Sequence, residues 1–286
     1  MLTYFQAIIF GILQGITELF PISSLGHSVV LPKLLGWNID QHAPFFLTFL
    51  VATHTATALV LFFYFFNDWK RILSGIFRSL KEREIKENDA SAKLGWLLVV
   101  TTIPAGILGI LFEKTFAKLF SNPQLVAVML ILNGLLLYGA EFLRKKQKEQ
   151  NKQAGSNERI AQLSWSQAIK IGLLQCIALV PGFSRTGATL TGSLLEGLSH
   201  EDAARFAFLL ATPIIGAASI LKLPELAGAA DRDVLIPVII GSITSAIAAY
   251  FSVKFLTKYF ETKTLTPFAI YCCVVGVVLS VLFFFH

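Results

Sequence analysis

Long runs of apolar residues alternate with short charged segments along most of the chain. Six runs approach or exceed the roughly 20 residues that an α-helix needs to cross the hydrocarbon core of a membrane. They cover residues 45–66, 94–112, 124–143, 203–222, 234–253 and 267–285. The pattern therefore predicts an all-α polytopic membrane protein with six transmembrane helices.

Two further apolar segments are interrupted before they can cross a membrane as ordinary spans. Residues 4–20 are apolar enough, but Pro21, the polar residues that follow it and Pro32 break the helix. Residues 167–180 stop in the same way at Pro181. Backbone groups freed inside a membrane must be shielded by protein or line a water-filled cavity. We therefore predict two re-entrant helical hairpins in addition to the six spans.

Composition and charge agree with a membrane protein. The chain of 286 residues is 55% hydrophobic and 15% charged, whereas soluble proteins carry about 25% charged residues. Of its 24 Lys and Arg residues, 16 lie in the segments 67–93, 144–160 and 254–266. The positive-inside rule assigns these segments to the cytoplasm and both termini to the outer side, with 81–88 expected as a solvated loop. The net charge of +6 therefore reflects topology, and no nucleic-acid partner is expected.

The two interrupted segments resemble each other at an offset of 161 residues. Ten residues of the first segment have an identical residue 161 positions later, namely Gln6, Ala7, Ile8, Gly11, Leu13, Gln14, Ile16, Ser23, Gly26 and Gly36. We expect one integral membrane domain, 1–286, with repeat 1 at about 1–150 and repeat 2 at about 161–286. Each repeat holds one hairpin and three spans, an odd number, so the second repeat must be inverted. Inverted repeats bring paired broken helices together near the middle of the membrane, where two hairpin tips can build one site.

The first segment carries an acid, hydroxyls and an imidazole. Gln14 and Glu18 are one helical turn apart and share a face, and Glu18 is suited to hold a divalent cation or to act as a base. Ser23, Ser24 and His27 follow on what we expect to be a short irregular stretch. A hydroxyl beside an imidazole is the minimum for an activated nucleophile, although His27 itself is an alternative attacking group.

The second segment carries groups suited to an anion. Arg185 offers a planar fork of donors that matches phosphate oxygens. The hydroxyls of Ser184, Thr186 and Thr189 can add further donors around the same anion. His54, in a different span, is a weaker candidate for the same site.

Each of these groups also has a structural interpretation. A hydroxyl in a membrane helix often bonds its own backbone, and Glu18 can form a purely structural ion pair with Arg185. However, a charged side chain at the centre of a membrane helix costs roughly 2.5–3.5 kcal/mol on insertion scales. The convergence of carboxylate, hydroxyl, imidazole and guanidinium on two related tips therefore favours a functional site.

The motifs on the two tips are similar to those of a known family. They read Gln14-x-x-x-Glu18, Pro21-x-Ser-Ser24-x-Gly-His27 and Pro181-Gly-x-Ser-Arg185-x-Gly-Ala-Thr189. Together with further tracts, they resemble the undecaprenyl-diphosphate phosphatase family, also called the bacitracin-resistance protein family, over essentially the whole chain. The resemblance implies an enzyme of the bacterial inner membrane that hydrolyses undecaprenyl diphosphate to the monophosphate and so regenerates the carrier lipid for peptidoglycan. It also implies a divalent cation, Mg²⁺ or Ca²⁺, and a site on the periplasmic side.

The resemblance also implies roles for individual residues. Glu18, with Gln14, would bind the metal or assist proton transfer, and Ser24 or His27 would be the nucleophile or its base. Arg185 would clamp the diphosphate. The neighbouring hydroxyls would bind substrate, namely those of Ser23, Ser184, Thr186 and Thr189. Two positions depart from many relatives, since Gln14 and Cys272 stand where Glu and Arg often occur.

Several alternatives stay open at this stage. Inverted repeats with intramembrane polar groups are also typical of transporters, so a flippase of a polyprenyl phosphate lipid is the alternative function. Phosphoryl transfer by attack of Ser24, of His27 or of water is compatible with the residues present. The polyprenyl diphosphate and membrane lipids are the expected partners. The sequence leaves the oligomeric state open, a homodimer included.

Overall fold

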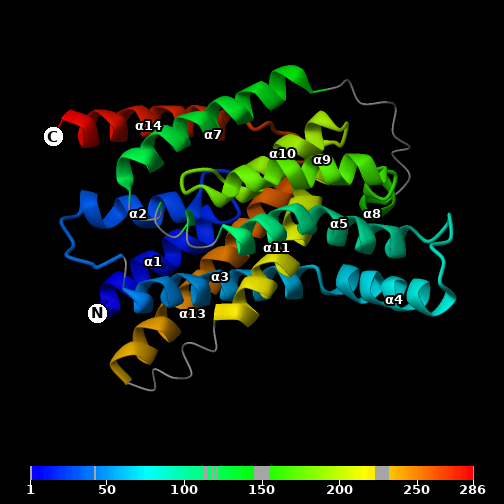
Figure 1. The fold of residues 1–286 in the computed structure, drawn as a ribbon, viewed down its shortest axis with the longest axis horizontal. Helices are drawn as coiled ribbons and strands as arrows, with labels where there is room; N and C mark the ends of the chain where they lie inside the picture. The colour runs from blue at the N-terminus through cyan, green and yellow to red at the C-terminus, as the bar shows by residue number, and fades with distance from the viewer. Residues whose placement is uncertain are drawn as a thin grey trace.

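Helices form the secondary structure of the chain in the computed structural model, which describes residues 2–41, 43–112, 115–116, 119, 122–144, 155–222 and 232–285. Their order is α1 (Tyr4–Thr17), α2 (Ser24–Leu34), α3 (Pro44–Tyr64), α4 (Phe66–Glu82), α5 (Ala90–Leu111), α7 (Pro123–Leu143), α8 (Ser156–Ile160), α9 (Trp165–Gln175), the 3₁₀ helix η1 (Cys176–Leu179), α10 (Arg185–Leu195), α11 (His200–Lys222), α13 (Arg232–Tyr259) and α14 (Thr266–Phe285) (Figure 1). None of these residues forms a strand.

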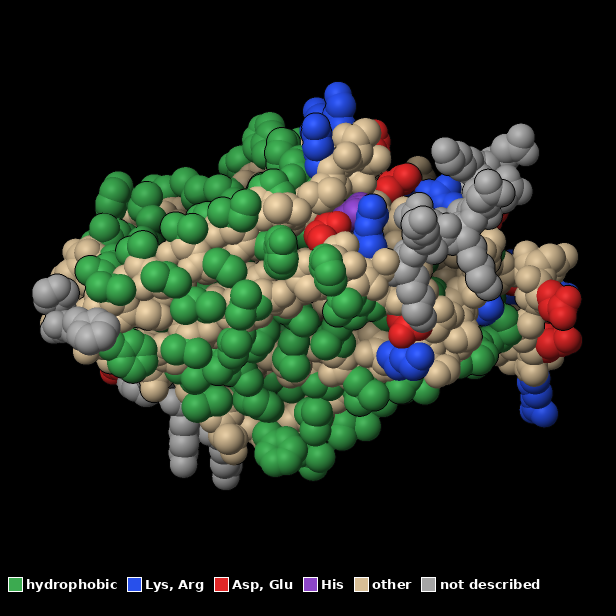
Figure 2. Space-filling model, turned by 90° about the horizontal axis from the view of Figure 1, so that it is seen from above, with side chains coloured by type: hydrophobic (Ala, Val, Ile, Leu, Met, Phe, Trp, Pro, Cys, Tyr) green, Lys and Arg blue, Asp and Glu red, His purple; other side chains and the backbone are tan. Residues whose placement is uncertain are grey.

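Six of these helices are long and apolar enough to cross a membrane, as the sequence predicts. They are α3, α5, α7, α11, α13 and α14. Large apolar side chains on them remain exposed, with Phe142 at 82% and Ile220 at 77% of full exposure. Figure 2 shows a mostly hydrophobic surface over the left and middle of the molecule, with charged side chains gathered toward the right. Because a soluble protein does not expose so continuous an apolar surface, this surface is the one that faces lipid.

Residues 66–82 form α4, whereas the sequence predicts that this segment is part of a basic loop. The helix is amphipathic, and its inner face buries Trp69, Ile72 and Gly75. A Cβ atom at Gly75 would lie 2.5 Å from the backbone nitrogen of Ala92, so the glycine allows α4 to pack closely on α5. Residues 83–88, beyond the helix, are non-helical and largely exposed, as expected for a solvated loop. Hydropathy alone missed α4 because its apolar residues are spread over a helical face.

The two interrupted segments each form a pair of short helices, α1 with α2 and α9 with α10. The first break is shorter than predicted, since only residues 18–23 are non-helical. The prediction that the stretch through His27 is irregular is wrong, because Ser23 caps α2 by accepting a hydrogen bond from the N–H of Gly26. Pro32 lies inside α2 and does not end it.

The two helical pairs match in local geometry. Both α1 and α9 begin with a capping box. Both α2 and α10 are capped by a serine, Ser23 and Ser184, whose hydroxyl accepts from the N–H three residues later. In Figure 1 the α1–α2 pair enters from the left and the α9–α10 pair from the right, and their breaks meet near the middle. The polar residues of both segments therefore converge inside the helical bundle.

Candidate active site

The break of each helical pair and the first turn of the helix after it, here called tip 1 (residues 18–27) and tip 2 (residues 180–187), contact each other directly. The Thr186 hydroxyl donates to the backbone carbonyl of Glu18 at 2.9 Å. A Cβ atom at Gly26 would lie 3.1 Å from the Cα atom of Gly182, so Gly26 of α2 packs closely against the backbone of tip 2. The structure therefore brings the two motifs of the sequence into one place.

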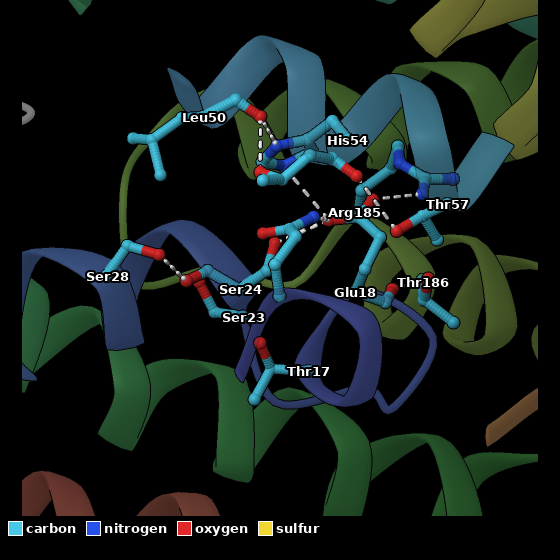
Figure 3. Close-up of polar contacts among 12 residues, drawn as sticks. Thr17, Glu18, Ser23, Ser24, Ser28, Leu50, His54, Thr57, Arg185 and Thr186 are labelled. Atoms are coloured by element: carbon cyan, nitrogen blue, oxygen red, sulfur yellow. Dashed lines mark hydrogen bonds and ion pairs between the residues drawn. The ribbon is translucent and has the colours of Figure 1, made fainter. Parts of the chain in front are cut away.

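The carboxylate of Glu18 is the centre of the site (Figure 3). It is 6% exposed, and its Oε1 lies 2.5 Å from Nη2 of Arg185. Its Oε2 accepts hydrogen bonds from Nε2 of Gln14 at 3.0 Å and from Oγ of Ser24 at 2.5 Å. The same oxygen lies 3.1 Å from Nε2 of His54. A buried carboxylate needs such partners, because desolvation of an unpaired charge is costly.

His54 belongs to this site, although it is only a weak candidate from its sequence context. It lies in the middle of α3, and its Nδ1 is 2.7 Å from the carbonyl oxygen of Leu50. Both ring nitrogens therefore face acceptors, an arrangement that an imidazolium satisfies by donating from each. If His54 is protonated, the positive charges of Arg185 and His54 exceed the single negative charge of Glu18, which favours an anion. The one available signal was a histidine inside an otherwise apolar span.

Arg185 has donor capacity that no protein group uses. It is the first residue of α10, and its Nη1 is buried with no hydrogen-bond partner among the described residues. A guanidinium binds phosphate through two parallel N–H groups. The N-termini of α2 and α10 also lie at the tips, and the positive end of a helix dipole stabilises an anion. Arg185 is therefore placed to hold a phosphate while it also contacts Glu18.

The backbone directly before Ser24 is strained. The residue before it, Ser23, has φ of +71°, a conformation that is uncommon for a residue with a side chain. Such strain is costly and often occurs at functional sites. Here it turns the chain so that Ser24 begins α2 with its hydroxyl on Glu18.

The other predicted site residues lie at different positions relative to this centre. His27 is not bonded to Ser24, because its Nδ1 lies 2.7 Å from the carbonyl oxygen of Ser23 and its Nε2 lies 2.8 Å from the hydroxyl of Tyr271. The Thr189 hydroxyl donates to the side chain of Gln175, and Thr189 is fully buried. The structure thus places His27 and Thr189 away from the cavity that holds Glu18, Ser24 and Arg185.

A cavity of about 300 Å³ lies beside the two tips. Its polar lining comes from Thr17, Glu18, Ser23, Ser24, His54, Ser184 and Arg185. The rest of its wall is apolar and includes Leu47, Leu50 and Val51 of α3 and Ile214, Ile215 and Ala218 of α11. A cavity with charged groups at one part and aliphatic walls elsewhere is suited to an amphiphilic ligand.

The residues present fit a cation that is delivered with a phosphate ligand. No group of three or more His, Cys, Asp or Glu with metal-binding geometry occurs among the described residues. However, Oε1 of Gln14 is buried with no hydrogen-bond partner among the residues described, and the Gln14 side chain is bonded to the carboxylate of Glu18. Mg²⁺ is often held by one or two carboxylates together with substrate phosphates and waters. Glu18 and Gln14 can supply the protein oxygens of such a site, whereas an all-protein cage is not present in the described residues.

Gly182 is expected to be the least replaceable glycine of tip 2. Its φ is +102°, and a Cβ atom would lie 2.6 Å from Cβ of Met129 and 2.8 Å from the carbonyl oxygen of Val126. Gly197 is a matched control, because its φ is +98° but a Cβ atom there would have no neighbour within 4 Å. We expect Gly197→Ala to destabilise the protein by about 1–2 kcal/mol, and Gly182→Ala by a further 1–3 kcal/mol or so from overpacking. The unfolding midpoints of the two variants in detergent measure these losses of stability. Equal midpoints for Gly182→Ala and Gly197→Ala would contradict the packing argument.

Comparison with known proteins identifies relatives over nearly the whole chain. A sequence model of the family described as "Bacitracin resistance protein BacA" matches residues 7–278. An undecaprenyl-diphosphatase of Mycolicibacterium paratuberculosis is 45% identical, over 96% of this chain and 95% of its own length. Undecaprenyl-diphosphatase 2 of Frankia alni is 40% identical, over 99% of this chain and 98% of its own length. An undecaprenyl-diphosphatase of Acidiphilium cryptum is 42% identical, over 94% of each chain.

Proposed function

The chain belongs to the bacitracin resistance protein BacA family, and we propose that it is an undecaprenyl-diphosphatase embedded in a membrane. It releases inorganic phosphate from undecaprenyl diphosphate and leaves undecaprenyl phosphate, the carrier lipid for cell-wall synthesis. The observation that carries the proposal is the free donor of Arg185 beside Ser24 and Glu18 in one cavity. Phosphoryl transfer depends mainly on positioning and on neutralisation of charge, which are the two things that this arrangement supplies.

The cavity also matches the two halves of the lipid. The diphosphate is expected at the polar lining, where Arg185 and the helix N-termini provide donors. The first units of the prenyl chain are expected along the leucine and isoleucine side chains of α3 and α11. Relatives named undecaprenyl-diphosphatase at 40–45% identity support this assignment of substrate.

In the proposed reaction, Ser24 attacks the terminal phosphorus in line with the bridging oxygen. The hydroxyl proton passes to Oε2 of Glu18, the acceptor to which Ser24 is already bonded. The Oγ–P bond forms while the bond from phosphorus to the bridging oxygen breaks, and undecaprenyl phosphate leaves with the electron pair. Arg185 and the protonated His54 stabilise the negative charge that develops.

Water then attacks the phosphoserine and completes the reaction. The Ser24 oxygen leaves and takes back the proton from Glu18, and dihydrogen phosphate is released with both hydrogens of the water. Glu18 thus replaces His27 as the base that we expected from the sequence, since Glu18 rather than His27 contacts the Ser24 hydroxyl. His27 is instead a contact between α2 and Tyr271 of α14.

A divalent cation is proposed to bind with the diphosphate at Glu18 and Gln14. When bound, it would neutralise part of the phosphate charge. We expect a chelator to abolish phosphate release and Mg²⁺ or Ca²⁺ to restore it. Gln14→Leu is expected to raise the cation concentration for half-maximal activity about 10-fold. Gln175→Leu, the equivalent change in the second segment, should leave it unchanged, because Gln175 is bonded to Thr189. Activity titrations with each cation test this, and identical titrations for Gln14→Leu and wild type would contradict the proposed ligand.

We also infer that the two helical pairs are re-entrant hairpins of an inverted repeat. Their matching caps and their opposite directions in Figure 1 support this arrangement. Helix α1 begins and α14 ends at one end of the molecule, while α4 and α8 lie toward the other. The positive-inside rule then assigns α4 and α8 to the cytoplasm, and the cavity is proposed to open toward the periplasmic side of the inner membrane.

The test of this function is phosphate release by the purified protein in detergent. Farnesyl and undecaprenyl diphosphates are the substrates, and the reaction is run with and without chelator. Release that requires the protein and a cation is expected. A protein that releases no phosphate from either lipid, while variants of Glu18 and Arg185 still impair cells, would instead support transport of a polyprenyl phosphate, because release needs no second compartment.

A further inference from the structure

A single asparagine in α7 is bonded to the backbone of both tips. Asn133 is fully buried, and its Nδ2 donates to the carbonyl oxygen of Pro21 in tip 1 at 3.0 Å. Its Oδ1 accepts from the backbone N–H of Ser184 in tip 2 at 3.1 Å. The two partners are 163 positions apart in the sequence, so one side chain joins the two halves of the candidate site.

The orientation of this amide is fixed by its partners. The partner from Pro21 is a carbonyl oxygen, which can only accept, and the partner from Ser184 is a backbone N–H, which can only donate. If the amide were flipped, its oxygen would face the Pro21 oxygen and its NH₂ group would face the Ser184 N–H, so both hydrogen bonds would be lost. Nδ2 of Asn133 also lies 3.3 Å from Sγ of Cys272 on α14. No other common side chain of this size offers a donor and an acceptor at these two positions.

The helix that carries Asn133 packs closely against α14. A Cβ atom at Gly134 would lie 2.8 Å from the carbonyl oxygen of Ala269 and 2.5 Å from Sγ of Cys273. This close approach packs α7 against α14 along their length. Asn133 therefore extends from a closely packed helix toward the non-helical residues of both tips.

We propose that Asn133 is a positioning residue that sets the distance between the nucleophile on tip 1 and the phosphate clamp on tip 2. Pro21 is three residues from Ser24, and Ser184 directly precedes Arg185. A shift of either tip thus moves Ser24 relative to Arg185, and a misplacement of about 1 Å is enough to cost 10²-fold in rate. This inference rests on the proposed phosphatase activity, and it assigns Asn133 no contact with the substrate.

Three variants separate positioning from folding. Asn133→Ala removes both hydrogen bonds, and Asn133→Asp keeps the acceptor for Ser184 but loses the donor to Pro21. The control is Gln124→Ala, which removes a side-chain to backbone bond from α7 to Phe283 of α14, roughly 13 Å along the same helix. We expect kcat to fall about 10²-fold in both Asn133 variants, with KM within about threefold, and to stay unchanged in Gln124→Ala.

Two measurements add a readout that a purely structural role would not change. In a double-mutant cycle, Arg185→Lys should reduce kcat less in the Asn133→Ala background than in the wild type, because the clamp is already misplaced. Hydrogen exchange should quicken at residues 18–24 and 182–187 in Asn133→Ala and not in Gln124→Ala. Unchanged kcat in Asn133→Ala, or an additive cycle with unchanged exchange at the tips, would overturn the proposal. The proposed function and the positioning role can also be judged apart. If the wild-type protein releases no phosphate, the proposed function is overturned; if Asn133→Ala nevertheless speeds exchange at both tips, the positioning role is kept.

Discussion

Replacement of Arg185 by alanine is expected to lower kcat/KM for a prenyl diphosphate about 10³-fold. Arginines that stabilise a transferring phosphoryl group typically contribute 10³–10⁵ in rate, and Nη1 of Arg185 has no hydrogen-bond partner in the part of the chain that the structure describes. Arg185→Lys keeps the charge but loses the bidentate geometry, so we expect an intermediate loss. Rates of phosphate release at varied substrate concentration give kcat/KM for the wild type, Arg185→Ala and Arg185→Lys.

Arg185→Ala is also expected to lower the stability of the protein, and this loss of stability must be separated from the loss of catalysis. Removal of one partner of a buried ion pair costs up to about 3–5 kcal/mol, and we expect a smaller loss here because Glu18 keeps its contacts with Gln14, Ser24 and His54. The double variant Glu18→Gln/Arg185→Ala removes both charges, so its unfolding midpoint should recover. Its activity should not recover. A folded double variant, or a single Arg185→Ala variant, with near wild-type phosphate release would exclude Arg185 as the clamp and leave the pair with Glu18 as structural.

Replacement of Ser24 by alanine is expected to lower kcat by roughly 10⁶-fold, the order of the loss when a serine hydrolase loses its nucleophile. KM should change little, because the hydroxyl contributes mainly to the transition state. Ser28→Ala is the matched control. Its hydroxyl is buried on the same helix but donates to the carbonyl oxygen of Ser24 rather than to Glu18, so kcat should stay near the wild-type value.

Trapping of the phosphoenzyme distinguishes this mechanism from direct attack by water. Acid quenching during turnover of a lipid labelled at its terminal phosphate should place the label on Ser24. The Ser24→Ala protein should carry none. A label on His27, or none on any residue together with a Ser24→Ala kcat near wild type, would rule out Ser24 as the nucleophile.

The six spans and the two breaks were predictable because they depend on local chemistry. A helix in lipid must satisfy its own backbone hydrogen bonds, so a run such as 124–143 specifies α7 almost to the residue. Pro21 and Pro181 interrupt apolar runs for an equally local reason. The high cost of charge in a membrane also indicated a site that contains Glu18 and Arg185, although a direct ion pair between them was only the structural alternative.

Helix α4 and the role of His54 were not predictable in the same way. The apolar residues of α4 lie on one face among lysines and arginines, so mean hydropathy hides them. His54 and Thr57 lie on the same span, but only His54 reaches Glu18, while Thr57 is bonded to Ser245 of α13. Which side of α3 faces the tips depends on how that helix packs, and no local pattern encodes this.

The sequence by itself determined the helices, their breaks and the chemical groups on each tip, because those follow from hydropathy, proline and the cost of buried charge. Only the tertiary structure decided which of the groups meet. It brought Ser24 to Glu18 and turned His27 toward Tyr271, although all three motif residues lie within ten positions. It also placed Asn133 between the tips. The physical reason is that side-chain contacts across the bundle depend on the rotation and close approach of distant helices, which local propensities do not fix.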